Sequence, residues 1–159
     1  LTEASKVLSD LLMFVGGSSG STAGGVKTVT MGLVVLSAVS TMRGRRQVTV
    51  FGRSISQEDI SNAVSIALLV MGLSLLGAAV ITVCDGCSFM NAIYETISAL
   101  CTVGLTTGIT PTLCTASKLI LIVFMFFGRV GIMTIGVGFM MGDRAKERVQ
   151  YAQTKVMIG

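Results

Sequence analysis

The sequence predicts an all-α membrane protein built from hydrophobic spans with shorter helical segments between them. Hydrophobic residues make up 52% of the chain, charged residues 13%, and the mean hydropathy is +0.82. A soluble domain usually carries about twice that charged fraction. Two apolar runs, 60–83 and 119–142, are long enough to cross roughly 30 Å of hydrocarbon, and the second is interrupted only by Arg129.

An internal repeat is the third observation behind this fold class. Residues 1–17 align without a gap with residues 113–129, and seven of 17 positions are identical. Repeated spans are a common construction of membrane transporters, so the two stretches are expected to be equivalent spans. The identical pairs are Leu1/Leu113, Ala4/Ala116, Ser5/Ser117, Lys6/Lys118, Met13/Met125, Phe14/Phe126 and Gly16/Gly128.

The first element, residues 1–42, is expected to be a span broken by a loop inside the membrane. The 39 residues from Ala4 to Met42 exceed a single crossing. Irregular backbone at membrane depth survives only where protein buries it or water lines it, which a loop directly under a pore would satisfy. The break consists of small residues: Gly16, Gly17, Ser18, Ser19, Gly20, Ser21, Thr22, Ala23, Gly24 and Gly25.

This break also has other interpretations. The Gly16, Gly20 and Gly24 spacing is typical of a helix-packing face as well, and this alternative stays open. Residues 16–20 match the G-x-S-x-G elbow of serine hydrolases, but the chain has no histidine to act as base. Residues 20–28 imitate a phosphate-binding loop, yet Val26 separates the glycine from Lys27 where the two must be adjacent. No enzyme activity is expected.

The next element, residues 43–59, is predicted to be a basic cytoplasmic loop. It carries four arginines, and the tail 142–159 carries four basic residues, whereas no Lys or Arg lies between Val83 and Ser117. The positive-inside rule therefore places the loop and the C-terminal tail in the cytoplasm and the 84–116 connection outside. Nucleic-acid or lipid binding by these charges is the alternative, although topology signals at span ends explain them; no nucleic-acid partner is expected.

Residues 60–141 have the layout of a pore loop, with a span at 60–83, a short apolar helix at 89–101 and a second span at 117–141. Between them, Thr102-Val-Gly-Leu-Thr106 is typical of a potassium-selective filter, in which backbone carbonyls replace the hydration shell of the ion. Thr102, Val103, Gly104 and Leu105 are the candidate ion ligands, with K⁺ at the first three. A competing register would make residues 14–20 a second filter, but it gives only three identities in seven.

Two charged side chains accompany this filter. The C-terminus of the 89–101 helix would point partial negative charge at a cation, and Glu95 within it is expected to brace the filter by hydrogen bonds. Arg129 lies mid-span, where an unpaired cation is costly. Since Arg129 aligns with Gly17, it could pin the small-residue loop across the pore, and it joins Lys27 and residues 16–25 as the candidate gate. A structural pair with a carboxylate on a missing span is the alternative.

Three stretches together resemble the Trk/Ktr/HKT superfamily of potassium transporters. They are 13–28, which contains Gly20-Ser-Thr-Ala-Gly-Gly25, then 98–108 and 125–131. The ending 155–159 is most similar to the Ktr branch. In this family, four repeats of span, pore helix and span surround one pore, and the protein is a homodimer. The resemblance implies that this chain, which starts at Leu1 inside a span, is the C-terminal part of a longer protein: the end of the third repeat and all of the fourth.

The resemblance also implies roles and partners. Residues 102–105 would be the fourth filter strand, with Gly104 its selectivity glycine, 16–25 the gating loop, and Arg129 the arginine beneath the filter. The protein would sit in the cell membrane as a multi-pass subunit among lipid. It would contact its missing N-terminal repeats, a second copy and a cytosolic ring of nucleotide-binding subunits. The nucleotide belongs to that ring, so no cofactor is expected on this chain; K⁺ is the transported ion and Na⁺ a candidate coupling ion.

The sequence departs from the family pattern at two places. Ser9 and Asp10 stand where apolar residues are expected, and Asp10 would either line the pathway or pair with a missing helix. Cys101 replaces a small residue before the filter. A non-conducting membrane scaffold, assembled through glycine-rich faces, is the alternative to a transporter.

Overall fold

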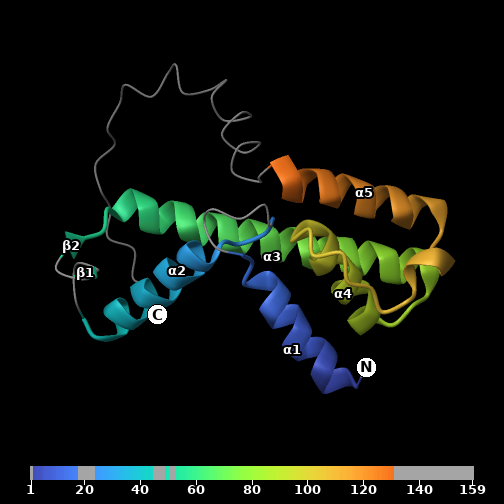
Figure 1. Ribbon diagram of the computed structural model, residues 1–159, viewed down its shortest axis with the longest axis horizontal. Helices are drawn as coiled ribbons and strands as arrows, with labels where there is room; N and C mark the ends of the chain where they lie inside the picture. Colours follow the sequence, from blue (N-terminus) through green and yellow to red (C-terminus); the bar gives the residue numbers. More distant parts are fainter. Residues whose placement is uncertain (1, 18–23, 45–48, 51–52, 131–159) are drawn as a thin grey trace, which may run out of the picture.

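The computed structural model describes residues 2–17, 24–44, 49–50 and 53–130, and within them it is almost entirely helical (Figure 1). A short antiparallel hairpin, β1 Thr49–Val50 with β2 Arg53–Ser54, lies in the basic loop. Residues 18–23 of the candidate gate, residues 131–141 of the last expected span and the tail 142–159 lie outside the described residues. The helices are α1 Glu3–Phe14, α2 Thr28–Met42, α3 Gln57–Asp85, α4 Phe89–Leu100 and α5 Thr115–Val130, with a 3₁₀ turn at Thr110–Thr112.

Helix α3 is the longest element, with 29 residues, and among the described helices it is the one long and apolar enough to cross a membrane. It begins earlier than the expected 60–83 span because Ser56 caps it: the Ser56 hydroxyl accepts a hydrogen bond from the Asp59 amide at 3.1 Å. It ends at Gly86, whose φ of 63° is the left-handed conformation that terminates many helices.

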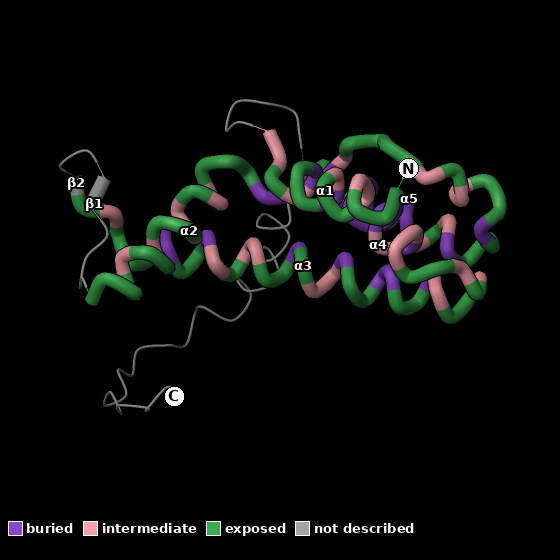
Figure 2. Tube along the Cα trace, turned by 90° about the horizontal axis from the view of Figure 1, so that it is seen from below, coloured by how far each residue is buried: buried purple, intermediate pink, exposed green. Residues whose placement is uncertain are grey.

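Helix α4 lies at the centre of the packing. It contacts α3 and α5, and α1 packs against it as well, whereas α2 runs along α3 (Figure 1). Every residue from Tyr94 to Leu100 is buried, and Figure 2 shows buried positions gathered around this helix. Ile81 of α3 and Leu121 and Phe124 of α5 form one hydrophobic cluster with Leu100. A short helix buried in this way is positioned by its longer neighbours.

The first element is divided into α1 and α2, as the run of small residues suggests. Helix α1 ends at Phe14, and Val15 then forms an isolated parallel bridge with Val26. The Gly16 amide donates to the Val26 carbonyl at 2.8 Å, and the Thr28 amide donates to the Gly17 carbonyl at 3.3 Å. The two ends of the intervening segment are therefore held together, and α2 starts directly after them.

Asp85 joins the C-terminal end of α3 to the N-terminal end of α5. One of its carboxylate oxygens accepts a hydrogen bond from the Cys114 amide at 2.6 Å, and the other accepts one from the Ser117 hydroxyl at 2.5 Å. These bonds hold the pKa of Asp85 below its usual range because they favour the charged form, and the bond from Ser117 has the larger effect. A carboxylate at the N-terminus of α5 also interacts favourably with the helix dipole.

The crossing of α4 and α5 is predicted to require glycine at position 128. A Cβ atom there would overlap the Leu100 carbonyl oxygen, which belongs to backbone and cannot move aside easily. Gly128→Ala should therefore lower the stability of the complete protein by about 1–3 kcal/mol, as overpacking does, measured as a fall in melting temperature in detergent. Gly72→Ala in α3 is the control, because nothing lies within 4 Å of its added methyl group. Equal melting temperatures for the two variants would contradict this packing.

Candidate functional site

The chain leaves α4 in a tight turn that starts the expected filter. Thr102 has a φ of 54°, and it is the one non-glycine residue with positive φ in the described part of the chain; Gly104 comes shortly after it with a φ of 82°. The amides of Thr102 and Val103 donate to the carbonyls of Ala99 and Ser98, at 3.2 and 3.0 Å. A non-glycine residue in this region of φ is uncommon and carries strain, so surrounding contacts must hold it.

The carbonyl groups of this segment divide into two sets. The Leu105 carbonyl accepts a hydrogen bond from the Ser98 hydroxyl at 2.6 Å, so it is committed to α4. Among the hydrogen bonds of the described residues, none is accepted by the main-chain carbonyls of Thr102, Val103 or Gly104. Of the four candidate ion ligands, these three therefore keep carbonyl oxygens that could bind an ion.

Glu95 holds the C-terminal end of the segment. One carboxylate oxygen accepts hydrogen bonds from the Thr106 hydroxyl at 2.6 Å, and from the Thr107 amide and hydroxyl at 2.9 and 3.1 Å. The other oxygen accepts one from the Thr110 hydroxyl at 2.9 Å. Glu95 is only 5% exposed. A buried carboxylate surrounded by donors is rigid, and here it ties residues 106–110 to the middle of α4.

The N-terminal end of the segment touches Gly24 and Gly25, where the small-residue loop returns. The Gly24 amide donates to the Thr102 hydroxyl at 2.8 Å. A Cβ atom on Gly24 would lie 2.7 Å from the Gly128 carbonyl oxygen, and one on Gly25 would lie 2.6 Å from the Cys101 sulfur. Gly25 also has a φ of 75°. Only glycine permits the loop to approach this closely on both counts.

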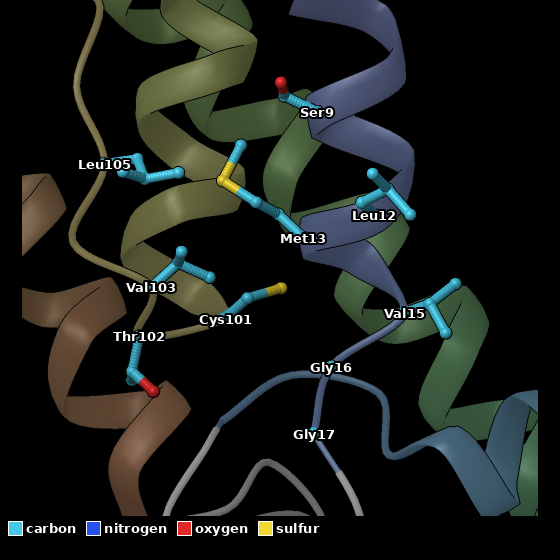
Figure 3. Close-up of a pocket in the computed structure, with 10 residues that line it drawn as sticks. All are labelled: Ser9, Leu12, Met13, Val15, Gly16, Gly17, Cys101, Thr102, Val103 and Leu105. Carbon is cyan, nitrogen blue, oxygen red and sulfur yellow. The ribbon is translucent and has the colours of Figure 1, made fainter.

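A cavity of about 530 Å³ opens beside these contacts (Figure 3). It is lined by three parts of the chain: one face of α1, the start of the small-residue loop, and the expected filter segment at 102–105. Figure 3 shows the Met13 side chain reaching from α1 toward the filter side, where Cys101 points back from the end of α4. The lining residues are Ser9, Leu12, Met13, Val15, Gly16, Gly17, Cys101, Thr102, Val103 and Leu105.

The structure brings together some of the expected site residues and not others. Gly16, Gly17, Gly24 and Gly25 lie at or near the filter segment, while Ser18 to Ala23 fall outside the described residues. Arg129 occupies the last turn of α5, directly after Gly128. Lys27 occupies the N-cap position of α2 rather than a position in the cavity wall.

Sequence reasoning anticipated that Glu95 makes hydrogen bonds beside this segment, but it missed the other side chains that hold the segment. It did not anticipate these contacts for the Ser98 hydroxyl, the Thr102 hydroxyl or the threonines bound to Glu95. Their signal was the density of Ser and Thr around residues 98–112, which an apolar membrane segment would not otherwise carry. Such hydroxyls at membrane depth indicate polar backbone that needs partners.

Comparison with known proteins identifies relatives along the whole chain. Residues 1–147 match the TrkH family, described as cation transport proteins. Over 164 aligned residues the chain is 34% identical to the potassium/sodium uptake protein NtpJ of Enterococcus hirae, covering 100% of the chain and 36% of NtpJ. It is 35% identical to the Ktr system potassium uptake protein B of Bacillus subtilis, covering 100% of the chain and 35% of that protein.

A further relative is the Ktr system potassium uptake protein B of Vibrio alginolyticus, 30% identical over 99% of the chain and 34% of that protein. The chain thus spans about a third of the length of these relatives. The family consists of membrane cation transporters and not of enzymes, so the hydrolase and phosphate-loop interpretations of residues 16–28 are set aside. The match over nearly the whole sequence means that this chain belongs to the TrkH family of cation transport proteins.

Proposed function

We propose that this chain forms one quarter of a potassium-selective pore in a membrane uptake protein, with residues 102–104 as its filter strand. The observation that carries the proposal is the segment after α4, where positive φ angles at Thr102 and Gly104 accompany three carbonyls without hydrogen bonds in the described part of the chain. The functions for which the relatives are named, potassium uptake and potassium/sodium uptake, support the same ion class.

The chemistry suits a monovalent cation. Potassium gives up its hydration shell to rings of backbone carbonyl dipoles, which need to be held in place rather than charged. Here the strand is held at both ends, by Thr102 below and by Leu105 and Thr106 above, so its middle carbonyls keep their spacing. The C-terminal end of α4 adds partial negative charge nearby. The other strands of the ring would come from the rest of the protein.

The same proposal makes residues 16–25 a gate beneath the filter. The returning arm of this loop is hydrogen-bonded to the Thr102 side chain and packed on Cys101 and Gly128. A segment so close to the first filter residue obstructs the path of an ion that leaves the filter. Arg129, next to Gly128, would fix the loop in this closed position.

The assembly and orientation come from the family resemblance. We propose a multi-pass protein with its C-terminus in the cytoplasm, a homodimer, and a cytosolic ring of nucleotide-binding subunits that meets the basic loop 43–59. Sodium is a candidate coupling ion. The second candidate function, a non-conducting scaffold, draws on the glycine contacts alone, because Gly24, Gly25 and Gly128 would serve packing in either case.

The first prediction from this proposal concerns Gly104. Its φ of 82° disfavours any side chain, although no atom lies within 4 Å of an added Cβ. Gly104→Ser should therefore relax the strand and reduce potassium-over-sodium discrimination about 10-fold or more, where 10-fold corresponds to roughly 1.4 kcal/mol. Uptake of both ions by the complete protein in transport-deficient cells measures this.

Gly86→Ser is the matched control for Gly104→Ser. Gly86 has a φ of 63° and equally open space, but it lies at the C-terminal end of α3, outside the proposed filter strand and the residues bound to Glu95. Its variant should keep the selectivity of the wild type. Unchanged discrimination in Gly104→Ser would remove residues 102–104 from the pore and favour the scaffold.

A second prediction concerns the gate. Shortening the segment 18–24 should raise the potassium flux several-fold, because less chain would lie across the pathway. Arg129→Gln should act in the same direction, and Arg53→Gln, which removes a charge in the basic loop, should not. Potassium flux into proteoliposomes is the measurement, and a fall in flux by properly folded protein would refute an obstructing role.

A third prediction concerns the clasp at Glu95, that is, the hydrogen bonds that its carboxylate accepts from Thr106, Thr107 and Thr110. In Glu95→Gln, the amide nitrogen replaces an acceptor oxygen, so at least one of the threonine donors loses its partner. A hydrogen bond to a charged group contributes about 1.5–3 kcal/mol, and we expect both a lower melting temperature and reduced potassium selectivity. Glu58→Gln, in the exposed first turn of α3, should change neither property. Wild-type selectivity in Glu95→Gln would show that the clasp does not shape the filter.

A further inference from the structure

Asp10 is a buried carboxylate that the proposed pore does not use. It lies in α1, is only 8% exposed, and its Oδ1 atom has no hydrogen-bond partner among the described residues. The nearest basic residue on the same helix, Lys6, is engaged elsewhere, with Glu3 at 2.9 Å and Asn91 at 2.8 Å. Acidic side chains within membrane segments are rare and are almost always paired.

Asp10 lines a second cavity, of about 400 Å³, on a different face of α1 from the filter. The filter cavity is bordered by Ser9, Leu12 and Met13, whereas the second cavity is bordered by Asp10 and Phe14 together with residues of α2, α3 and α4. Asp10 is therefore not placed to contact an ion in the proposed pathway. Of the two roles expected for it from the sequence, lining the pathway is the less favoured.

The walls of the second cavity are apolar apart from one hydroxyl. That hydroxyl, of Ser74, donates to the Met71 carbonyl at 2.9 Å and so does not donate to Asp10. The cavity is also lined by the apolar side chains of Met31, Met71 and Ile93. None of these side chains can compensate the charge of the Asp10 carboxylate. The cavity thus combines an apolar lining with a single negative group.

We infer that this cavity receives a lysine or arginine side chain from a membrane helix of the same polypeptide that lies outside residues 1–159. The inference rests on charge complementarity at Asp10 and on length, because the relatives extend well beyond the third of their sequence that this chain matches. A long basic side chain has the required form: its methylene groups suit the apolar walls, and its charged head reaches the carboxylate. The inference does not depend on the filter or gate assignments.

The test is a set of double-mutant cycles on the complete protein purified in detergent, read as melting temperature. Asp10→Leu leaves the basic partner buried and unpaired, so it should lower the melting temperature by about 5 °C or more. Each Lys and Arg expected within the membrane outside residues 1–159 is then replaced by Leu in the Asp10→Leu background. One of these second substitutions should recover at least half of the loss, and this identifies the partner.

Glu3→Leu is the matched control, because Glu3 is an exposed carboxylate on the same helix. It should show no coupling with the same basic residues. If Asp10→Leu does not accumulate, Asp10→Asn replaces it throughout the set. The inference is overturned if no double variant melts above the single one, or if Asp10→Leu melts at or above the wild type. It is also overturned, in favour of an inorganic cation site, if added Na⁺ or K⁺ raises the melting temperature of the wild type but not of Asp10→Asn.

Discussion

The contact on which the rest of the structure depends is the meeting of three backbones at the C-terminal end of α4. Gly128 of α5 lies against the Leu100 carbonyl, and Gly24 and Gly25 lie against Thr102 and Cys101. A Cβ atom at any of these three glycines would clash, so the glycine backbone itself forms the packing surface. As a result, the backbone of these glycines packs directly on the Leu100 carbonyl and on the side chains of Thr102 and Cys101, and these contacts position the turn into residues 102–104.

The segment after this contact is stabilised by a different means. Above the turn, hydroxyl and carboxylate groups take over: Ser98 holds the Leu105 carbonyl, and Glu95 holds the threonines at positions 106, 107 and 110. Both belong to α4, and α4 is buried by α3 and α5 through Leu100 and its neighbours. The apolar packing therefore fixes α4, and the polar side chains of α4 in turn fix the irregular segment that follows it.

The sequence predicted the elements better than it predicted their contacts. Apolar length and the small residues at 16–25 were enough to anticipate α3, α4 and the division between α1 and α2. The span that became α3 proved longer than expected, since the Ser56 cap carries the helix into polar residues. The bond from Gly24 to Thr102 could not be anticipated, because it joins residues 78 positions apart and depends on how two loops approach each other. Local patterns carry no information on such distances.

The internal repeat shows how a small sequence difference changes an element. Helices α1 and α5 begin at equivalent positions of the repeat, Glu3 and Thr115, yet α1 stops at Phe14 while α5 continues to Val130. The aligned glycines, Gly16 and Gly128, do not cause this difference, since both repeats have them. The difference arises from the residues after these glycines. Gly17 and a run of Ser and Gly favour turns and loops and offer little surface to pack, whereas Arg129 and Val130 can continue a helix. One aligned stretch can thus continue as a helix to Val130 in one repeat and leave the helix for a loop after Phe14 in the other.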